Sequence, residues 1–208
     1  MNYSVVLSSI FALHVLAMIS PGPNVLVVAQ TAISRTRRAG IFISLGIATG
    51  AAVWSSAALL GLNLLFTQFP WFYSGLKVMG GIYLLYIGAK MWRAADHPLI
   101  PSRGLCLSAQ TDWQAFRLGL LTNLTNPKAA IFYGSIFAAL LKPDFPVWVK
   151  LTAIGIIVFN AVWWHISLAY LFSTQYTRQV YQRIKRWIDR IAGTALAFFG
   201  LLLIHVNR

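Results

Sequence analysis

The chain has 208 residues, of which 58% are hydrophobic and only 10% are charged. Its mean hydropathy is +0.68. Soluble domains carry roughly 25% charged residues, so this composition excludes an ordinary soluble domain. The net charge of +13 would suit nucleic-acid binding. The basic residues stand between apolar runs rather than along one face, however, so nucleic acid is not an expected partner. A single cysteine, Cys106, excludes a disulfide within the chain.

Apolar runs follow one another along the whole chain, each near the roughly 20 residues that cross the hydrocarbon core of a bilayer. The runs are continuous rather than alternating with period two, which argues against transmembrane strands. In chain order they span residues 4–34, 41–66, 69–91, 116–141, 148–172 and 187–206. We therefore predict an all-α membrane protein with six transmembrane helices, forming a single domain over residues 1–208.

The first run is too long for one straight helix and is interrupted by Ser20-Pro21-Gly22-Pro23-Asn24. Each proline lacks an N–H and clashes with the carbonyl four residues earlier, so the break would release the carbonyls of Ala17 and Ile19. Gly22 permits non-helical backbone angles, and Asn24 is predicted to cap a new half-helix. Within a membrane, such free groups must be buried in protein or line a wet cavity. The alternative is a simple kink that neighbouring helices satisfy.

The positions of the basic residues orient the chain. None precedes Arg35, so the first run is expected to be a membrane helix rather than a signal peptide. The connections after the first, third and fifth runs hold most of the lysines and arginines: Arg35, Arg37 and Arg38; Lys90, Arg93, Arg103 and Arg117; Arg178, Arg183, Lys185, Arg186 and Arg190. The opposite side holds Lys142, Lys150 and Arg208. The positive-inside rule then predicts that both termini lie outside the cytoplasm, which in a bacterial inner membrane would be the periplasm.

The six runs divide into two similar halves, about residues 1–93 and 113–208, which a polar stretch over 93–115 joins. Pro127 breaks the first helix of the second half, as the paired prolines break that of the first. The third helices share a seven-residue glycine spacing at an offset of 112: Gly81 and Gly88, and Gly193 and Gly200. Halves of three helices enter the membrane from opposite sides, so we predict two inverted three-helix repeats with broken first helices. Paired interruptions of this kind indicate the binding site of a transporter.

The second break reads Thr122-Asn123-Leu124-Thr125-Asn126-Pro127-Lys128. Lys128 lies well inside its apolar run, where a cation is a functional hypothesis by default. Its expected role is counter-ion to a substrate carboxylate, aided by the positive N-terminal ends of the half-helices. Free carbonyls and the amides of Asn24 and Asn126 would receive an ammonium group. A solute that carries both a carboxylate and an ammonium group is a zwitterionic amino acid, and this is the ligand that the two breaks predict.

The other polar residues in the runs leave more than one interpretation open. His14 and His165 would either face the cavity or pack as satisfied core histidines. Asp189 and Arg190 are expected at the membrane surface. If transport is coupled to protons, the candidates are His14, His165, Lys128 and Asp189. No grouping of His, Cys and carboxylates predicts a metal site, and no nucleotide motif predicts a cofactor.

The two breaks resemble motifs of the LysE/RhtB family of bacterial amino-acid exporters, and the resemblance covers essentially the whole chain. The matching segments are Ser20-Pro21-Gly22-Pro23-Asn24, Gln30-Thr31-Ala32, Arg37-Arg38-Ala39-Gly40, Gly119 to Ala129, and Trp187-Ile188-Asp189 with Ala192-Gly193. The last of these is similar to the closing helix of the threonine-efflux branch.

This resemblance implies a bacterial inner-membrane transporter, rather than an enzyme, that exports threonine, homoserine or a close relative under the proton-motive force. Some family members carry an acidic residue where this chain has Asn24, so the amide argues against a carboxylate proton site there. Exporters of basic or leucine-like amino acids, and a facilitator or channel for another metabolite, remain alternatives. A membrane serine protease is disfavoured, because Ser135 has no clear partner. The sequence leaves the oligomeric state open, including a homo-oligomer.

Overall fold

The computed structural model describes residues 2–20, 22–68, 70–96, 111–142 and 144–205. In these ranges every regular element is a helix, which confirms the all-α class. The eight helices are α1 (Tyr3–Ile19), α2 (Pro23–Ser34), α3 (Arg37–Gln68), α4 (Pro70–Ala94), α5 (Asp112–Leu124), α6 (Pro127–Leu140), α7 (Val147–Leu171) and α8 (Gln175–His205).

Both interruptions predicted from the prolines are present. The first run folds as α1 and α2, which meet at an angle of 60°. The first run of the second half folds as α5 and α6, with the break at Thr125 and Asn126. Pro23 and Pro127 each stand at the start of a new helix, where the missing N–H costs nothing.

Two described helices are long and apolar enough to cross a membrane by themselves, the Arg37–Gly61 part of α3 and the whole of α7. A third span is added if the bent pair of Tyr3–Ile19 and Pro23–Ala32 is counted as one. The structure thus supports a helical membrane protein with two or three candidate spans, while the set of six stays a prediction.

The last predicted run, 187–206, is too short. Helix α8 begins at Gln175, twelve residues before the apolar segment. Its first turns carry many charged and polar side chains, so a hydropathy pattern does not register them as helix. Asp189 lies in this helix, and its level at the membrane surface stays a prediction. Its side chain is fully buried and pairs with Lys185 one turn earlier, at 2.5 Å.

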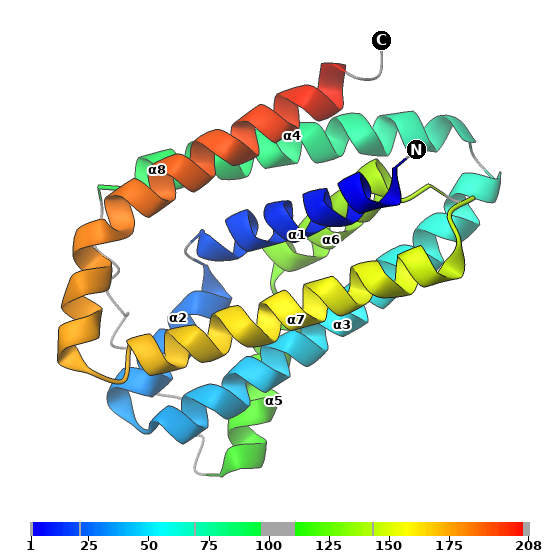
Figure 1. Cartoon of the computed structure of the whole chain (residues 1–208). Helices are drawn as coiled ribbons and strands as arrows, with labels where there is room; N and C mark the ends of the chain where they lie inside the picture. The colour runs from blue at the N-terminus through cyan, green and yellow to red at the C-terminus, as the bar shows by residue number, and fades with distance from the viewer. Residues whose placement is uncertain (1, 21, 69, 97–110, 143, 206–208) are drawn as a thin grey trace.

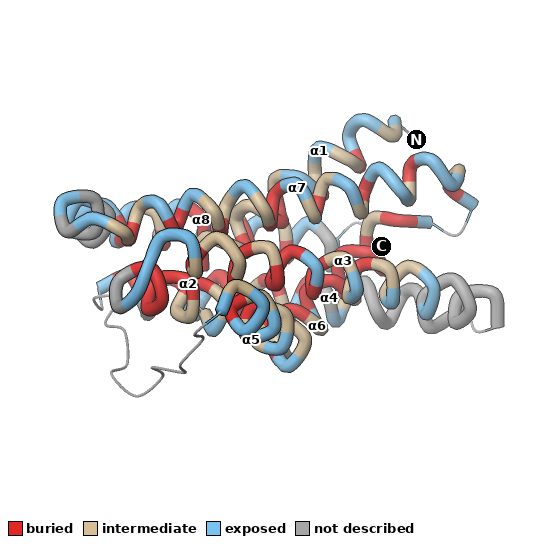
Figure 2. Tube along the Cα trace, turned by 90° about the horizontal axis from the view of Figure 1, so that it is seen from below, coloured by how far each residue is buried: buried red, intermediate tan, exposed pale blue. Residues whose placement is uncertain are grey.

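The long helices pack on either side of α1 and α6 (Figure 1). Helix α3 packs along α7, and α4 packs along α8, while α1 and α6 lie between these two pairs. The largest apolar core cluster surrounds α1 and α6 and includes Ile10, Leu84, Phe137, Ile157 and Leu196. Figure 2 shows buried residues along the inward sides of the helices and exposed residues outside. The packing therefore places α1 and α6, one half of each interrupted helix, between the two long helix pairs.

Helices α4 and α8 cross at the four repeat glycines. A Cβ at Gly81 would lie 2.7 Å from the Gly200 carbonyl oxygen, and one at Gly88 would lie 2.6 Å from the Gly193 carbonyl oxygen. The lower-numbered glycine of α4 meets the higher-numbered glycine of α8, so the two helices run antiparallel. Any larger side chain would separate them.

Helices α3 and α5 are equally close. A Cβ at Gly46 would collide with the backbone of Phe116, and one at Gly50 would lie 2.7 Å from the side-chain oxygen of Asn123. Gly46 and Gly50 therefore allow α3 and α5 to pack in close contact.

Candidate functional site

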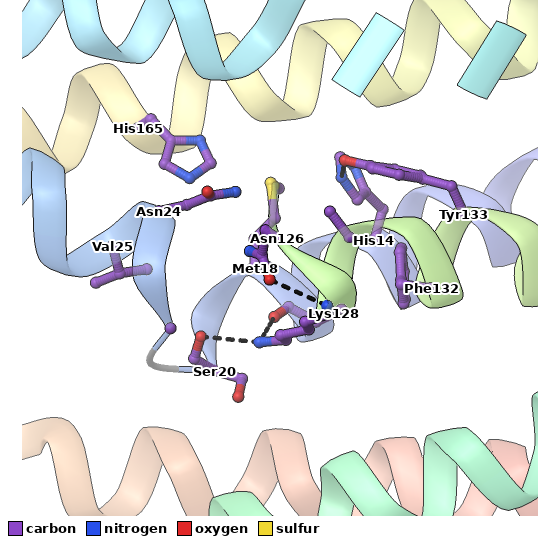
Figure 3. Close-up of a pocket in the computed structure, with 13 residues that line it drawn as sticks. His14, Met18, Ser20, Asn24, Val25, Asn126, Lys128, Phe132, Tyr133 and His165 are labelled. Carbon is purple, nitrogen blue, oxygen red and sulfur yellow. Dashed lines mark hydrogen bonds between the residues drawn. The ribbon is translucent and has the colours of Figure 1, made fainter. Parts of the chain in front are cut away.

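A cavity of about 50 Å³ lies between the two helix breaks. Side chains from α1, α2, α6 and α7 line it, together with the chain that joins α1 to α2 (Figure 3). A cavity needs at least roughly 10–15 Å³ to hold one water, so this space is small but not closed to solvent. The site therefore fits a small solute better than a large one.

Lys128 connects the two breaks. It stands in the first turn of α6, and its ammonium donates to the carbonyl oxygens of Ala17 and Ser20, each at 3.1 Å. These carbonyls belong to the end of α1, where the chain leaves the helix. The release of the Ala17 carbonyl was predicted from Pro21, which has no N–H to offer it. A lysine from the second half of the chain satisfies this carbonyl.

Both polar main-chain groups of Lys128, the N–H and the carbonyl, are hydrogen-bonded to side chains. Its N–H donates to the side-chain oxygen of Asn126 at 3.0 Å, which makes Asn126 the N-cap of α6. Its carbonyl accepts a hydrogen bond of 3.0 Å from the hydroxyl of Tyr83 on α4. The start of α6 is therefore fixed before the side chain reaches toward α1.

His14 lies at another side of the cavity and is buried to 1% exposure. Its Nε2 is 3.1 Å from the hydroxyl of Tyr133, and its ring stacks on Phe132. Its Nδ1 is buried with no hydrogen-bond partner among the described residues. His14 thus both packs in the core and faces the cavity, the two roles left open by the sequence.

His165 and Asn24 lie on a third side of the cavity (Figure 3). The Nδ1 of His165 is 2.8 Å from the Ala161 carbonyl oxygen of its own helix. The predicted capping role of Asn24 is wrong, because Gly22 is the N-cap of α2 and no side chain caps that helix. Pro23 occupies the first helical position, which leaves Asn24 one residue too late. Its buried side-chain oxygen has no partner within the described chain.

The cavity thus brings together six of the predicted site residues: His14, Gly22, Asn24, Asn126, Lys128 and His165. Asn123 is not among its lining residues and lies against α3, beside Gly50. The carbonyl of Asn123, four residues before Pro127, accepts hydrogen bonds from Trp54 Nε1 and the Asn126 N–H. Pro23 is exposed, whereas Pro21 and the side chain of Pro127 lie outside the described residues.

Asp189 lies away from this cavity's lining, on α8. One carboxylate oxygen bonds Lys185, and the other is buried without a partner in the described part of the chain.

Sequence reasoning missed several residues of the site. Phe132 and Tyr133 follow Lys128 by about one turn of α6, so helical spacing from the lysine would have found them. Tyr83 carries no such signal, because its contact with the Lys128 carbonyl depends on how α4 packs against α6. Metal-ligand groups are absent from the described residues, where no three His, Cys, Asp or Glu side chains gather.

The family model described as LysE type translocator matches residues 15–207. The chain belongs to this LysE family. It is 36% identical over 192 residues to the threonine efflux protein of Escherichia coli (strain K12), covering 92% of this chain and 93% of the relative.

Other relatives of this LysE-family chain show similar identity and coverage. The threonine efflux protein of Salmonella typhi is 37% identical over 193 residues, covering 92% of this chain and 93% of the relative. The uncharacterized membrane protein YahN of Escherichia coli (strain K12) is 36% identical over 194 residues, covering 93% of this chain and 86% of the relative. No solved structure matches the chain. Two of these relatives are named threonine efflux proteins and the third a membrane protein, in keeping with a translocator.

Proposed function

We propose that this protein is a secondary transporter that exports small neutral amino acids of the threonine and homoserine type from the cytoplasm. The observation that carries the proposal is the cavity between the two breaks, in which both interrupted helices meet at Lys128. Efflux proteins that transport threonine share more than a third of their residues with this chain over nearly its full length, which supports the substrate class.

The cavity has groups for both charges of an amino acid. The ammonium of Lys128 has three N–H donors and gives two of them to carbonyls, so one remains for a substrate carboxylate. The N-terminal ends of α2 and α6 begin at Gly22 and Asn126, beside the same cavity, and favour an anion there. The unpartnered oxygen of Asn24 is our candidate acceptor for the substrate ammonium. Asn123, Pro21, Pro23 and Pro127 would act by shaping the breaks.

The architecture we propose is a single domain of six membrane spans over residues 1–208, built as two inverted three-helix repeats. The glycine crossing supports it. If residue i of the first half corresponds to residue i + 112 of the second, exchanging the halves turns the Gly81–Gly200 contact into the Gly193–Gly88 contact. A two-fold axis between the halves requires this reciprocity. Alternating access would then come from one repeat moving against the other.

In the membrane, we place both termini in the periplasm and the basic connections in the cytoplasm of a bacterial cell, following the positive-inside rule. The proton-motive force is the proposed energy source. His14, His165 and Asp189 are the candidate proton carriers, since each is a buried titratable group in or near the site. Asp189 forms a buried ion pair with Lys185. A proton on the Asp189 carboxylate would remove its negative charge and so disrupt this pair.

The test is efflux of labelled threonine from proteoliposomes with an imposed pH gradient, with homoserine, serine, leucine and lysine as competitors. Saturable efflux that the gradient accelerates and small neutral amino acids block supports the proposal. Absence of flux above protein-free vesicles, in protein shown to be folded, would contradict it. Counterflow of labelled against unlabelled substrate distinguishes a carrier from a channel, because only a carrier exchanges them.

A further inference from the structure

The end of α1 has the properties of a cation site. The last carbonyls of a helix carry partial negative charge and have no partner within the helix. Ser20, the C-cap, has an extended backbone, and α1 has no basic residue in its last turn. The next residues, Pro21 and Pro23, have no N–H to donate. This helix end therefore depends on a donor from elsewhere in the chain.

The donor that it receives is the side-chain ammonium of Lys128. This ammonium lies 3.1 Å from both the Ala17 and the Ser20 carbonyl oxygens. Gly22 borders the same space, since a Cβ there would lie 3.8 Å from the lysine Nζ. Carbonyls of unwound or terminal helix segments are the groups with which transporters hold small monovalent cations.

We propose that Lys128 is a tethered cation: its ammonium fills a monovalent-cation site that the broken end of α1 creates, and without it the site binds a free small cation. The ligand class is a primary ammonium or a monovalent metal ion of similar size. This site is separate from the substrate, which would take the third N–H of the same ammonium, and the proposal does not require the transported molecule to be known.

The tether has a structural consequence. The first break is held by a residue whose backbone is fixed in the second break by Asn126 and on α4 by Tyr83. A movement of α6 therefore pulls directly on the end of α1. A free cation would stabilise α1 equally well but would not link it to α6.

Chemical rescue tests the proposal. The variant Lys128→Ala removes the ammonium and opens its space, and methylammonium is the probe that replaces the missing group. Thermal unfolding of the purified full chain in detergent would be measured in rising methylammonium chloride, with choline chloride at equal ionic strength as the bulky reference. We expect the Tm of Lys128→Ala to rise by a few degrees in methylammonium relative to choline. The wild type should show no difference between the salts.

Two further variants make the result specific. Lys142→Ala removes an exposed lysine from the connection after α6 and should behave as wild type in both salts. Lys128→Met removes the charge but fills the space with an uncharged chain, so it should lose stability and gain no response to methylammonium.

The other possible outcomes also support or reject the tethered-cation site. Equal Tm values for Lys128→Ala in the two salts, or the same rise in Lys142→Ala, would overturn the tethered-cation site. If Lys128→Ala is not recovered folded in choline chloride, purification is repeated in methylammonium chloride. Recovery there supports the site, and failure there rejects it.

Discussion

The two helix breaks differ in how their backbone groups are satisfied. At the second break, nearby residues do this: Thr125 donates its N–H and hydroxyl to the Leu121 carbonyl, and Asn126 caps α6. At the first break no side chain caps α2, and the α1 carbonyls are satisfied by Lys128, which is more than 100 residues away in the sequence.

This difference indicates which break can change shape. The second break keeps the hydrogen bonds of Thr125 and the Asn126 cap without help from other helices, because their donors and acceptors lie in the same short segment, although Trp54 of α3 also donates to the Asn123 carbonyl. The first break keeps its geometry only while Lys128 is in place. We therefore expect the end of α1 to be the part of the site that responds to substrate, with α6 as the fixed side.

The largest effect should come from removing the link between the breaks. Lys128→Met is expected to reduce threonine efflux at least about tenfold, because both the α1 contact and the proposed carboxylate anchor are lost. Efflux from proteoliposomes at matched protein content measures it, with Lys142→Ala as the control. Normal transport by Lys128→Met would show that neither role of Lys128 matters for function.

A second large effect should follow from repairing the first break alone. Pro21→Ala combined with Pro23→Ala restores two N–H donors and removes about 3 kcal/mol of opposition per proline to a continuous helix. We expect efflux to fall several-fold while thermal stability is kept. Pro146→Ala, just before α7, is the control because no helix is interrupted there. Full activity in the double variant would favour a simple kink over a functional break.

How far the sequence predicts this site depends on the range of each interaction. The breaks follow from proline chemistry within four residues, and both are present at Pro23 and Pro127. The partner of the released Ala17 carbonyl was not predictable, because Lys128 reaches it only after α1 and α6 pack together. The burial of Asp189 was missed for the same reason: its amphipathic helix reads as surface until α8 is packed.

A moderate effect is expected at the self-contained second break. Asn126→Ala removes the N-cap of α6, and the loss of such a cap typically costs about 1 kcal/mol. For a chain of this size that corresponds to a Tm lower by about 2–4 °C. Asn126→Ser, which keeps a capping oxygen, should recover most of the loss. A Tm drop equal in both variants would mean that the cap does not stabilise this break.

The smallest effect is predicted for Gly22→Ala, although Gly22 lies at the centre of the first break. Its backbone is extended, with φ −168° and ψ −178°, so an alanine adopts it without strain. The added Cβ would lie 3.8 Å from the Cδ and Nζ of Lys128, which is ordinary van der Waals contact. We expect stability to change by no more than about 0.5 kcal/mol.

The matched variant is Gly88→Ala, whose Cβ would lie 2.6 Å from the Gly193 carbonyl oxygen and force α4 away from α8. That overpacking should cost about 1–3 kcal/mol. If Gly22→Ala lost as much stability as Gly88→Ala, the first break would depend on glycine itself rather than on Lys128. A small loss leaves the lysine as the feature that distinguishes the two breaks, because the geometry at Gly22 then tolerates any small side chain.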